Sequence, residues 1–136
     1  MPENIYHLEI ESNPRNLITV EEFVNYFAVD LGVNADKIPG LLLSVTEAST
    51  NSIIHANKSD ESKLVTIDVT KENNQLIIHV KDKGKGFDPT KIPDPTDSDN
   101  LLKDSGRGIY LMRVYMDDLK FNITPEGTET ILTLNL

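Results

Sequence analysis

Apolar and polar residues alternate along several stretches of the chain, and this pattern predicts β-strands because successive strand side chains point to opposite faces. In 64–70, for example, every second residue is apolar, and the same holds in 75–82. The residues 72–74 (ENN) between these two stretches predict a hairpin turn. The predicted strands are 5–11, 64–70, 75–82, 119–124 and 129–135.

Apolar residues at three- and four-residue spacing predict helices. Thr19, with Glu22 three residues later, forms a capping-box pattern, so the first helix should begin there and end near Gly32. A longer helix is predicted over 37–56, and a third from 106 to about 117. The buried stripe of the longer helix should consist of Leu42, Val45, Ser49, Ile53 and Ala56.

The order of these elements indicates an α+β protein. We expect a two-layer α/β sandwich in which about three helices cover one face of a mixed, mostly antiparallel sheet, since the two hairpins exclude an all-parallel sheet. The 136 residues fit one domain, 1–136. Residues 88–105 contain several Pro, Asp, Ser and Thr and lack an apolar period, which predicts a long loop. A loop of this length in a compact domain is usually functional or disordered.

The composition narrows the classes of function. A formal net charge of −9 argues against sequence-independent binding to DNA or RNA, which needs an excess of Lys and Arg. The absence of cysteine excludes disulfides and thiolate chemistry, and the scattered histidines do not form a metal-binding pattern. The N-terminus does not resemble a signal peptide, and no apolar run approaches the roughly 20 residues that span a bilayer. We therefore expect a cytoplasmic protein with no nucleic-acid or membrane partner.

Glu47 and Asn51 are four residues apart on the longer predicted helix, so their side chains share one face. An Asn carbonyl oxygen is a hard, neutral ligand that suits Mg²⁺. A nearby Glu can orient or deprotonate an attacking hydroxyl. The alternative is a solvated helix face, which explains the same pair without any function.

Glycines follow two of the predicted structural boundaries. After the strand 75–82, the run Asp82-Lys83-Gly84-Lys85-Gly86 places a carboxylate beside glycines, which let a planar ligand approach the backbone. The carboxylate can accept a hydrogen bond from an exocyclic amino group such as that of adenine. A plain turn after a strand is the alternative.

At the second boundary, Gly106-Arg107-Gly108 leads from the long loop into a helix, where exposed amides and the helix dipole favour phosphate. Arg107 suits the charge that develops in phosphoryl transfer. A flexible helix start explains a single glycine here but is a weaker explanation of Gly-Arg-Gly. Gly127-Thr128, before the last strand, is fully explained by a hairpin turn.

These four elements occur in one order: ExxxN on a helix, DxGxG after a strand, GxG into a helix, and GT before the last strand. In this order they resemble the GHKL (Bergerat-fold) ATPases, which include the catalytic domains of histidine kinases. The segments 47–56 (ExxxNxIIHA), 82–88 (DKGKGFD) and 105–118 (SGRGIYLMRVYMDD) look more narrowly like the anti-sigma-factor serine kinases. The similarity extends over nearly the whole chain, from about residue 5 to residue 136.

The resemblance implies roles for the matching residues. Asn51 corresponds to the family's Mg²⁺ ligand and Glu47 to its candidate general base. Asp82 would accept a hydrogen bond from the adenine amino group, with Thr128 supporting the same edge. Residues 88–105 would form a lid over ATP. The glycines and the arginine would surround the nucleotide, with Gly84 and Gly86 beside adenine and Gly106, Arg107 and Gly108 at the phosphate end.

The resemblance also implies a function: holding a sigma factor inactive and using Mg²⁺-ATP to phosphorylate a Ser or Thr of a STAS-type antagonist. The family commonly forms homodimers, and the sequence leaves the oligomeric state open. Three alternatives stay open as well. The chain could be a nucleotide-dependent binding switch without transfer activity, or a detached histidine-kinase catalytic domain, which His7 does not favour because it lies in a predicted strand. In the third, the glycines simply form turns.

Overall fold

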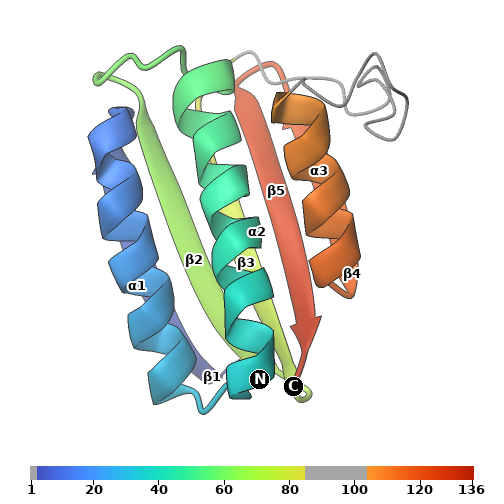
Figure 1. Cartoon of the computed structure of the whole chain (residues 1–136). Helices are drawn as coiled ribbons and strands as arrows, with labels where there is room; N and C mark the ends of the chain where they lie inside the picture. The colour runs from blue at the N-terminus through green and yellow to red at the C-terminus, as the bar shows by residue number, and fades with distance from the viewer. Residues whose placement is uncertain (1–2, 85–103) are drawn as a thin grey trace.

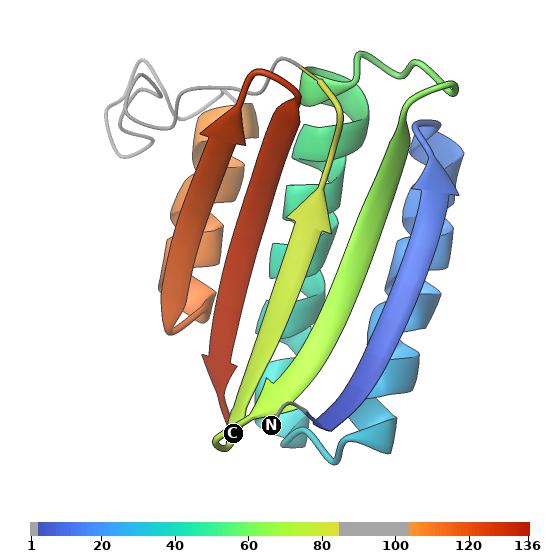
Figure 2. The same cartoon turned by 180° about the vertical axis from the view of Figure 1, so that it is seen from behind.

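The computed structural model describes residues 3–84 and 104–136. Five strands form one sheet in the order β1-β2-β3-β5-β4. The three α-helices of the described residues lie side by side over one face of it (Figure 1). The other face carries no helix of the described residues (Figure 2). In chain order the elements are β1 (Glu3–Glu11), η1 (Pro14–Asn16), α1 (Leu17–Asp30), η2 (Ala35–Lys37), α2 (Ile38–Thr50), η3 (Asn51–Ala56), β2 (Leu64–Glu72), β3 (Gln75–Lys81), α3 (Asp104–Tyr115), β4 (Asp118–Thr124) and β5 (Gly127–Asn135).

The alternating strands form the sheet for the expected reason: every second residue of β2 and β3 is buried on the face that the helices cover. Val65 and Ile67 of β2 are fully buried, as are Leu76, Ile78 and Val80 of β3. The register pairs them across the two strands, with Ile67 opposite Val80. Burial of these side chains on one face fixes the register, because a slip of one residue would turn each of them toward solvent.

The α+β class and the two-layer arrangement are confirmed, but all four strand pairings are antiparallel rather than mixed. The connections explain this difference. Two α-helices separate β1 from β2, and the chain reverses direction before α1, before α2 and before β2. After these three reversals β2 runs antiparallel to β1. One helix separates β3 from β4, which gives these two strands the same direction, but β5 lies between them.

The capping box predicted at Thr19 is wrong, because α1 already begins at Leu17. The chain turns helical earlier because the Asn13 side chain accepts a hydrogen bond from the backbone N–H of Arg15 at 2.9 Å, with Pro14 in the next position. Asn before Pro is a helix start signal in its own right. At the other end the predicted stop is confirmed, since Gly32 has φ +69° and directly follows the C-cap.

The long helix predicted over 37–56 is confirmed in extent, but its last six residues, η3, form a π-helical turn. The hydroxyls of Ser49 and Thr50 donate to the carbonyls of Val45 and Thr46 at 2.8 and 2.9 Å, just before this change. Such bonds compete with the backbone ladder and bend helices. A π-turn inside a helix is often found at a functional site.

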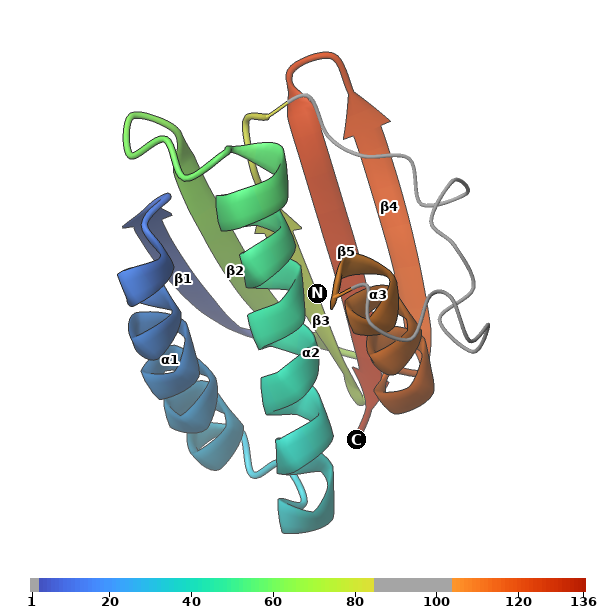
Figure 3. The same ribbon diagram turned by 45° about the horizontal axis from the view of Figure 1, so that its top comes forward.

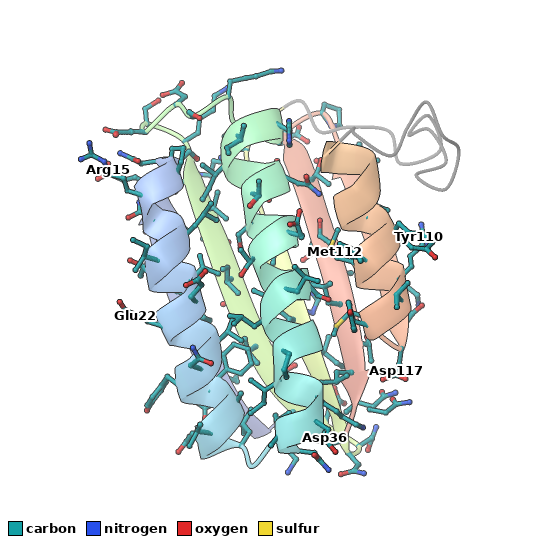
Figure 4. The ribbon with its side chains drawn as sticks, viewed as in Figure 1. Arg15, Glu22, Asp36, Tyr110, Met112 and Asp117 are labelled. Atoms are coloured by element: carbon teal, nitrogen blue, oxygen red, sulfur yellow. The ribbon has the colours of Figure 1, made fainter. Side chains whose placement is uncertain are left out.

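The third helix, α3, begins at Asp104, two residues before its predicted start and inside the segment expected to be loop. Met112 is fully buried and lies between α2 and α3, whereas Tyr110 points away from the molecule (Figure 4). Near the end of α3, Tyr115 packs against Gly40 so closely that a Cβ there would lie 2.7 Å from the ring. This close approach sets the distance between α2 and α3.

The β2–β3 turn offers a test of the fold away from any candidate site. Asn73 and Asn74 have φ values of 53° and 61°, the left-handed pair that a two-residue hairpin turn requires. Asn73→Val should lower the free energy of unfolding by about 1–2 kcal/mol, because a β-branched residue is strained there. Asn73→Gly, the control, should change it by less than about 0.5 kcal/mol. Urea denaturation measures both, and equal effects would contradict the turn geometry.

Candidate functional site

Asp82 directly follows β3, at the end of the sheet where β5 starts and η3 ends. Figure 3 turns this end of the molecule toward the viewer, with the last turn of the α2–η3 helix and the start of α3 in front of the sheet. The Asp82 N–H donates to the carbonyl of Thr128 at 3.0 Å. Its carboxylate Oδ1 accepts two further hydrogen bonds, from the N–H of Gly84 at 3.1 Å and of Thr128 at 3.0 Å.

The Asp82 carboxylate is buried, with the residue only 7% exposed. Burial raises its pKa above the ordinary value, although the two backbone amides and the Ser52 hydroxyl partly offset the effect by hydrogen bonding to the charged form. Both amides contact Oδ1, and a carboxylate has about four acceptor positions. The group therefore retains acceptor capacity for a further donor.

Thr128 lies beside this carboxylate and is 2% exposed. Its Oγ1 is buried without a hydrogen-bond partner among the described residues. A buried hydroxyl without a partner costs free energy, so such atoms are rare and indicate a site that something else satisfies. Gly127-Thr128 was the weakest pattern in the sequence, yet the Thr128 hydroxyl is one of two such atoms among the described residues, with Thr46 Oγ1, and it belongs to a residue whose N–H binds the Asp82 carboxylate.

The two glycines near Asp82 are required by contacts within the chain. A Cβ at Gly84 would lie 2.0 Å from the carbonyl oxygen of Ala56, at the end of η3. Gly127 has φ +157°, and a Cβ there would lie 2.1 Å from the carbonyl oxygen of Asp82. Glycine at both positions lets η3, the loop after β3 and the start of β5 come together.

Asn51 is the first residue of η3 and is only 4% exposed. A solvated helix face, the alternative explanation for Asn51, is therefore excluded. Ser52, the next residue, hydrogen bonds to Asp82, so the start of η3 and the end of β3 meet at this point.

Glu47 lies one turn before Asn51 and is half-buried. Its Oε2 lies 2.5 Å from the position that a Cβ of Gly108 would occupy, so the carboxylate faces α3. The absence of a side chain at Gly108 makes room for it. The structure thus brings the predicted site residues together in two pairs, Asp82 with Thr128 and Glu47 with Gly108. Along the helix, Asn51 follows Glu47 by one turn and directly precedes Ser52, which contacts Asp82.

Several predicted residues lie outside the described part of the structure. Gly86 and residues 88–103 of the expected lid are among them. Gly106 and Arg107 belong to the first turn of α3, but the position of the Arg107 side chain lies outside the described part. Within 3–84 and 104–136, no group of three or more His, Cys, Asp or Glu could hold a metal ion, and no helix is long and apolar enough to cross a membrane.

The sequence patterns did not indicate Asn57 as a residue of this site. It is fully buried, directly after η3, and its Oδ1 accepts a hydrogen bond from the N–H of Lys83 at 3.0 Å. The residues after it, Lys58 and Ser59, both have φ +56°. An Asn followed by a polar run predicts only a turn at a helix end, so the sequence carried no sign of its burial.

Residues 10–134 match the family model for the histidine kinase-like ATPase domain. The chain belongs to the histidine kinase-like ATPase family. It is 33% identical over 121 residues to the anti-sigma F factor of Clostridium botulinum (strain Alaska E43 / Type E3), a match that covers 88% of this chain and 85% of that relative. It is also 31% identical over 137 residues to the anti-sigma F factor of Bacillus subtilis (strain 168), covering 98% and 93%. The resemblance seen in the motifs is confirmed.

Solved structures show the same fold. The RsbU and RsbW domains of a Mycobacterium tuberculosis protein match with a TM-score of 0.74 at 14% identity, over 99% of this chain and 33% of that longer one. A blue-light activated histidine kinase of Erythrobacter litoralis matches with a TM-score of 0.60 at 21% identity, over 90% and 41%. At these identities the likeness concerns the fold.

The packing of Gly84 leads to a prediction about stability. Gly84→Ala should lower the free energy of unfolding by about 2–3 kcal/mol or more, because the added methyl meets the backbone of Ala56 rather than a flexible side chain. Gly32→Ala is a control for the contact: its φ of +69° is strained for alanine, but nothing lies within 4 Å of the added methyl. It should cost about 1 kcal/mol. A Gly84→Ala variant as stable as Gly32→Ala would refute the contact.

Proposed function

We propose that this chain is an ATP-dependent protein serine/threonine kinase of the anti-sigma-factor type. One observation carries the ATP-binding part: a buried carboxylate with remaining acceptor capacity, Asp82, stands beside a buried hydroxyl without a partner, Thr128. Adenine presents an amino donor next to a ring-nitrogen acceptor. The Asp82 carboxylate would accept from the amino group and the Thr128 hydroxyl would donate to the ring nitrogen.

Asn51 would hold Mg²⁺ through its side-chain oxygen, a ligand of the kind this ion prefers. When bound, the ion neutralises phosphate charge. The first turn of α3 would receive the phosphates, since helix N-termini bind anions through their free amides. Gly86 would border the adenine, residues 88–105 would form the lid, and Gly106 and Gly108 would let the backbone approach the phosphates.

Glu47 would act as the general base. Its side chain faces α3, the helix that would bind the phosphates, and Asn51 lies one helical turn away. The carboxylate would take the proton of a Ser or Thr hydroxyl as that oxygen bonds to the γ-phosphorus and the bond to ADP breaks. Arg107 would stabilise the charge that develops on the transferred group.

The protein partners follow from the relatives. Two of them carry the name anti-sigma F factor, and their matches span most of both chains. We infer that this chain binds a sigma factor and phosphorylates a STAS-type antagonist. A binding switch without transfer would share the nucleotide residues and lack only the transfer step. A detached histidine-kinase domain is less favoured, because His7 lies within strand β1 and contacts Asp68.

Nucleotide binding should depend on the charge of Asp82. Its pKa is raised in the free protein, and the ionised form is the one that accepts from adenine, so affinity for ADP should fall as pH drops through this raised pKa. Isothermal titration of Mg²⁺-ADP against the wild type and Asp82→Asn measures the ratio of their affinities. The ratio should exceed about tenfold near neutral pH and shrink on acidification. Asp36→Asn, exposed in η2 (Figure 4), is the control and should bind like the wild type.

Failure of the wild type to bind ADP, or binding unaffected by Asp82→Asn, would overturn the nucleotide assignment.

The kinase step has a separate test. Glu47→Gln should leave ADP affinity within about twofold of the wild type but lower the rate of γ-phosphate transfer by at least about 100-fold, because the amide cannot take the proton. Transfer of labelled phosphate to a STAS-type substrate measures the rate. Glu22→Gln, on the exposed side of α1 (Figure 4), should retain full activity. Transfer at the wild-type rate in Glu47→Gln would show that Glu47 is not the base, and no transfer by the wild type would favour the binding switch.

A further inference from the structure

Asn57 is a fully buried polar residue that takes no part in the chemistry described above. Its side-chain amide contacts three separate segments of the chain, two of which are distant from it in sequence. Oδ1 accepts from the N–H of Lys83 at 3.0 Å, and Nδ2 donates to the hydroxyl of Ser12 at 2.8 Å. Longer contacts, of 3.4 and 3.5 Å, join Nδ2 to the carbonyls of Lys63 and Leu64. One side chain thus joins the loop after β3 to the end of β1 and the start of β2.

The contact with Lys83 matters most, because Lys83 lies between Asp82 and Gly84. The Asp82 carboxylate and the Gly84 N–H that donates to it are therefore on either side of the residue that Asn57 holds. The Lys83 N–H belongs to the peptide group that joins Asp82 to Lys83, so its hydrogen bond to Asn57 fixes the orientation of that peptide group. The Asp82 side chain branches from the Cα atom at one end of this peptide group, so the same bond restricts the directions open to the carboxylate.

Two further contacts fasten the same loop to η3. Ser52 hydrogen bonds to the Asp82 carboxylate, and Gly84 packs against the carbonyl of Ala56. Asn57 follows Ala56 directly, so the loop is attached along the turn that begins with Asn51. The Asn57 bond is the only one of the three that holds the Lys83 backbone by a directional hydrogen bond.

We propose that Asn57 is a positioning residue for adenine recognition. It holds the loop 82–84 on η3, so that Asp82 keeps a fixed orientation relative to Asn51. This role rests on the proposed function, in which Asp82 accepts from the adenine amino group. Asparagine suits the position because it supplies an acceptor for Lys83 and a donor for Ser12 from one short side chain.

The contact with the amino group can be measured separately from binding in general. Inosine diphosphate carries an oxygen where adenine carries the amino group, so the ratio of ADP to inosine diphosphate affinity reports on the Asp82 contact. We expect Asn57→Ala to lower this ratio by about tenfold in the presence of Mg²⁺, since a misdirected carboxylate loses about one hydrogen bond. The control is Val69→Ala, which removes buried apolar atoms from β2, because Val69 makes none of the hydrogen bonds of Asn57. This variant should have lower thermal stability and an unchanged ratio of ADP to inosine diphosphate affinity.

A folded Asn57→Ala variant with the wild-type ratio would overturn the positioning role. A wild type that does not prefer ADP to inosine diphosphate would instead overturn the adenine assignment of Asp82. If Asn57→Ala does not fold, amide hydrogen exchange of the wild type decides. The Lys83 N–H should exchange at least about 100-fold more slowly than an unprotected amide, and more slowly again with ADP bound. Unprotected exchange at Lys83 would refute the proposal.

Discussion

The burial of the Asp82 carboxylate constrains everything around it. A carboxylate removed from water needs hydrogen-bond donors, and here the donors are the backbone amides of Gly84 and Thr128. Bringing both amides to one oxygen requires the loop after β3 and the start of β5 to lie in contact, which in turn requires glycine at positions 84 and 127. These hydrogen bonds stabilise the charged carboxylate, but burial still raises the pKa of Asp82 above its ordinary value. The carboxylate keeps acceptor capacity for a donor group of a ligand.

The two ends of the sheet differ in how tightly their backbone segments pack. At the β2–β3 turn, Asn73 and Asn74 make an ordinary two-residue hairpin on the surface. At the opposite end of the sheet, three segments pack tightly against one another: η3, the loop after β3, and the start of β5. A methyl group added at Gly84 or at Gly127 would collide with backbone atoms there. Tight backbone packing keeps side chains such as Asp82 and Asn51 in one geometry, and preorganised polar groups bind without the cost of being ordered.

The sequence predicted the five strands and three α-helices of the described residues. Apolar alternation and helical spacing indicated β2, β3 and α2 because both patterns reflect burial on one face, whereas capping and glycine patterns indicated α1 and α3. Element ends and local geometry were less predictable. The start of α1 depends on Asn13 rather than Thr19, and the π-turn at Asn51 has no sequence signature. The motif residues Asp82 and Asn51 could be chosen from the pattern of the sequence. Asn57 could not, since its burial results from contacts with Ser12 and Lys83, which are distant along the chain.

The central claim is that the end of the sheet around Asp82 binds the adenine base. Titration of the isotope-labelled protein with Mg²⁺-ADP, followed by amide chemical shifts, tests it most directly. The largest saturable shifts should occur at Gly84 and Thr128, whose N–H groups bind the Asp82 carboxylate, while Asn73 and Asn74 at the opposite end should not move. Saturable shifts confined to other regions, with Gly84 and Thr128 unchanged, would contradict the account.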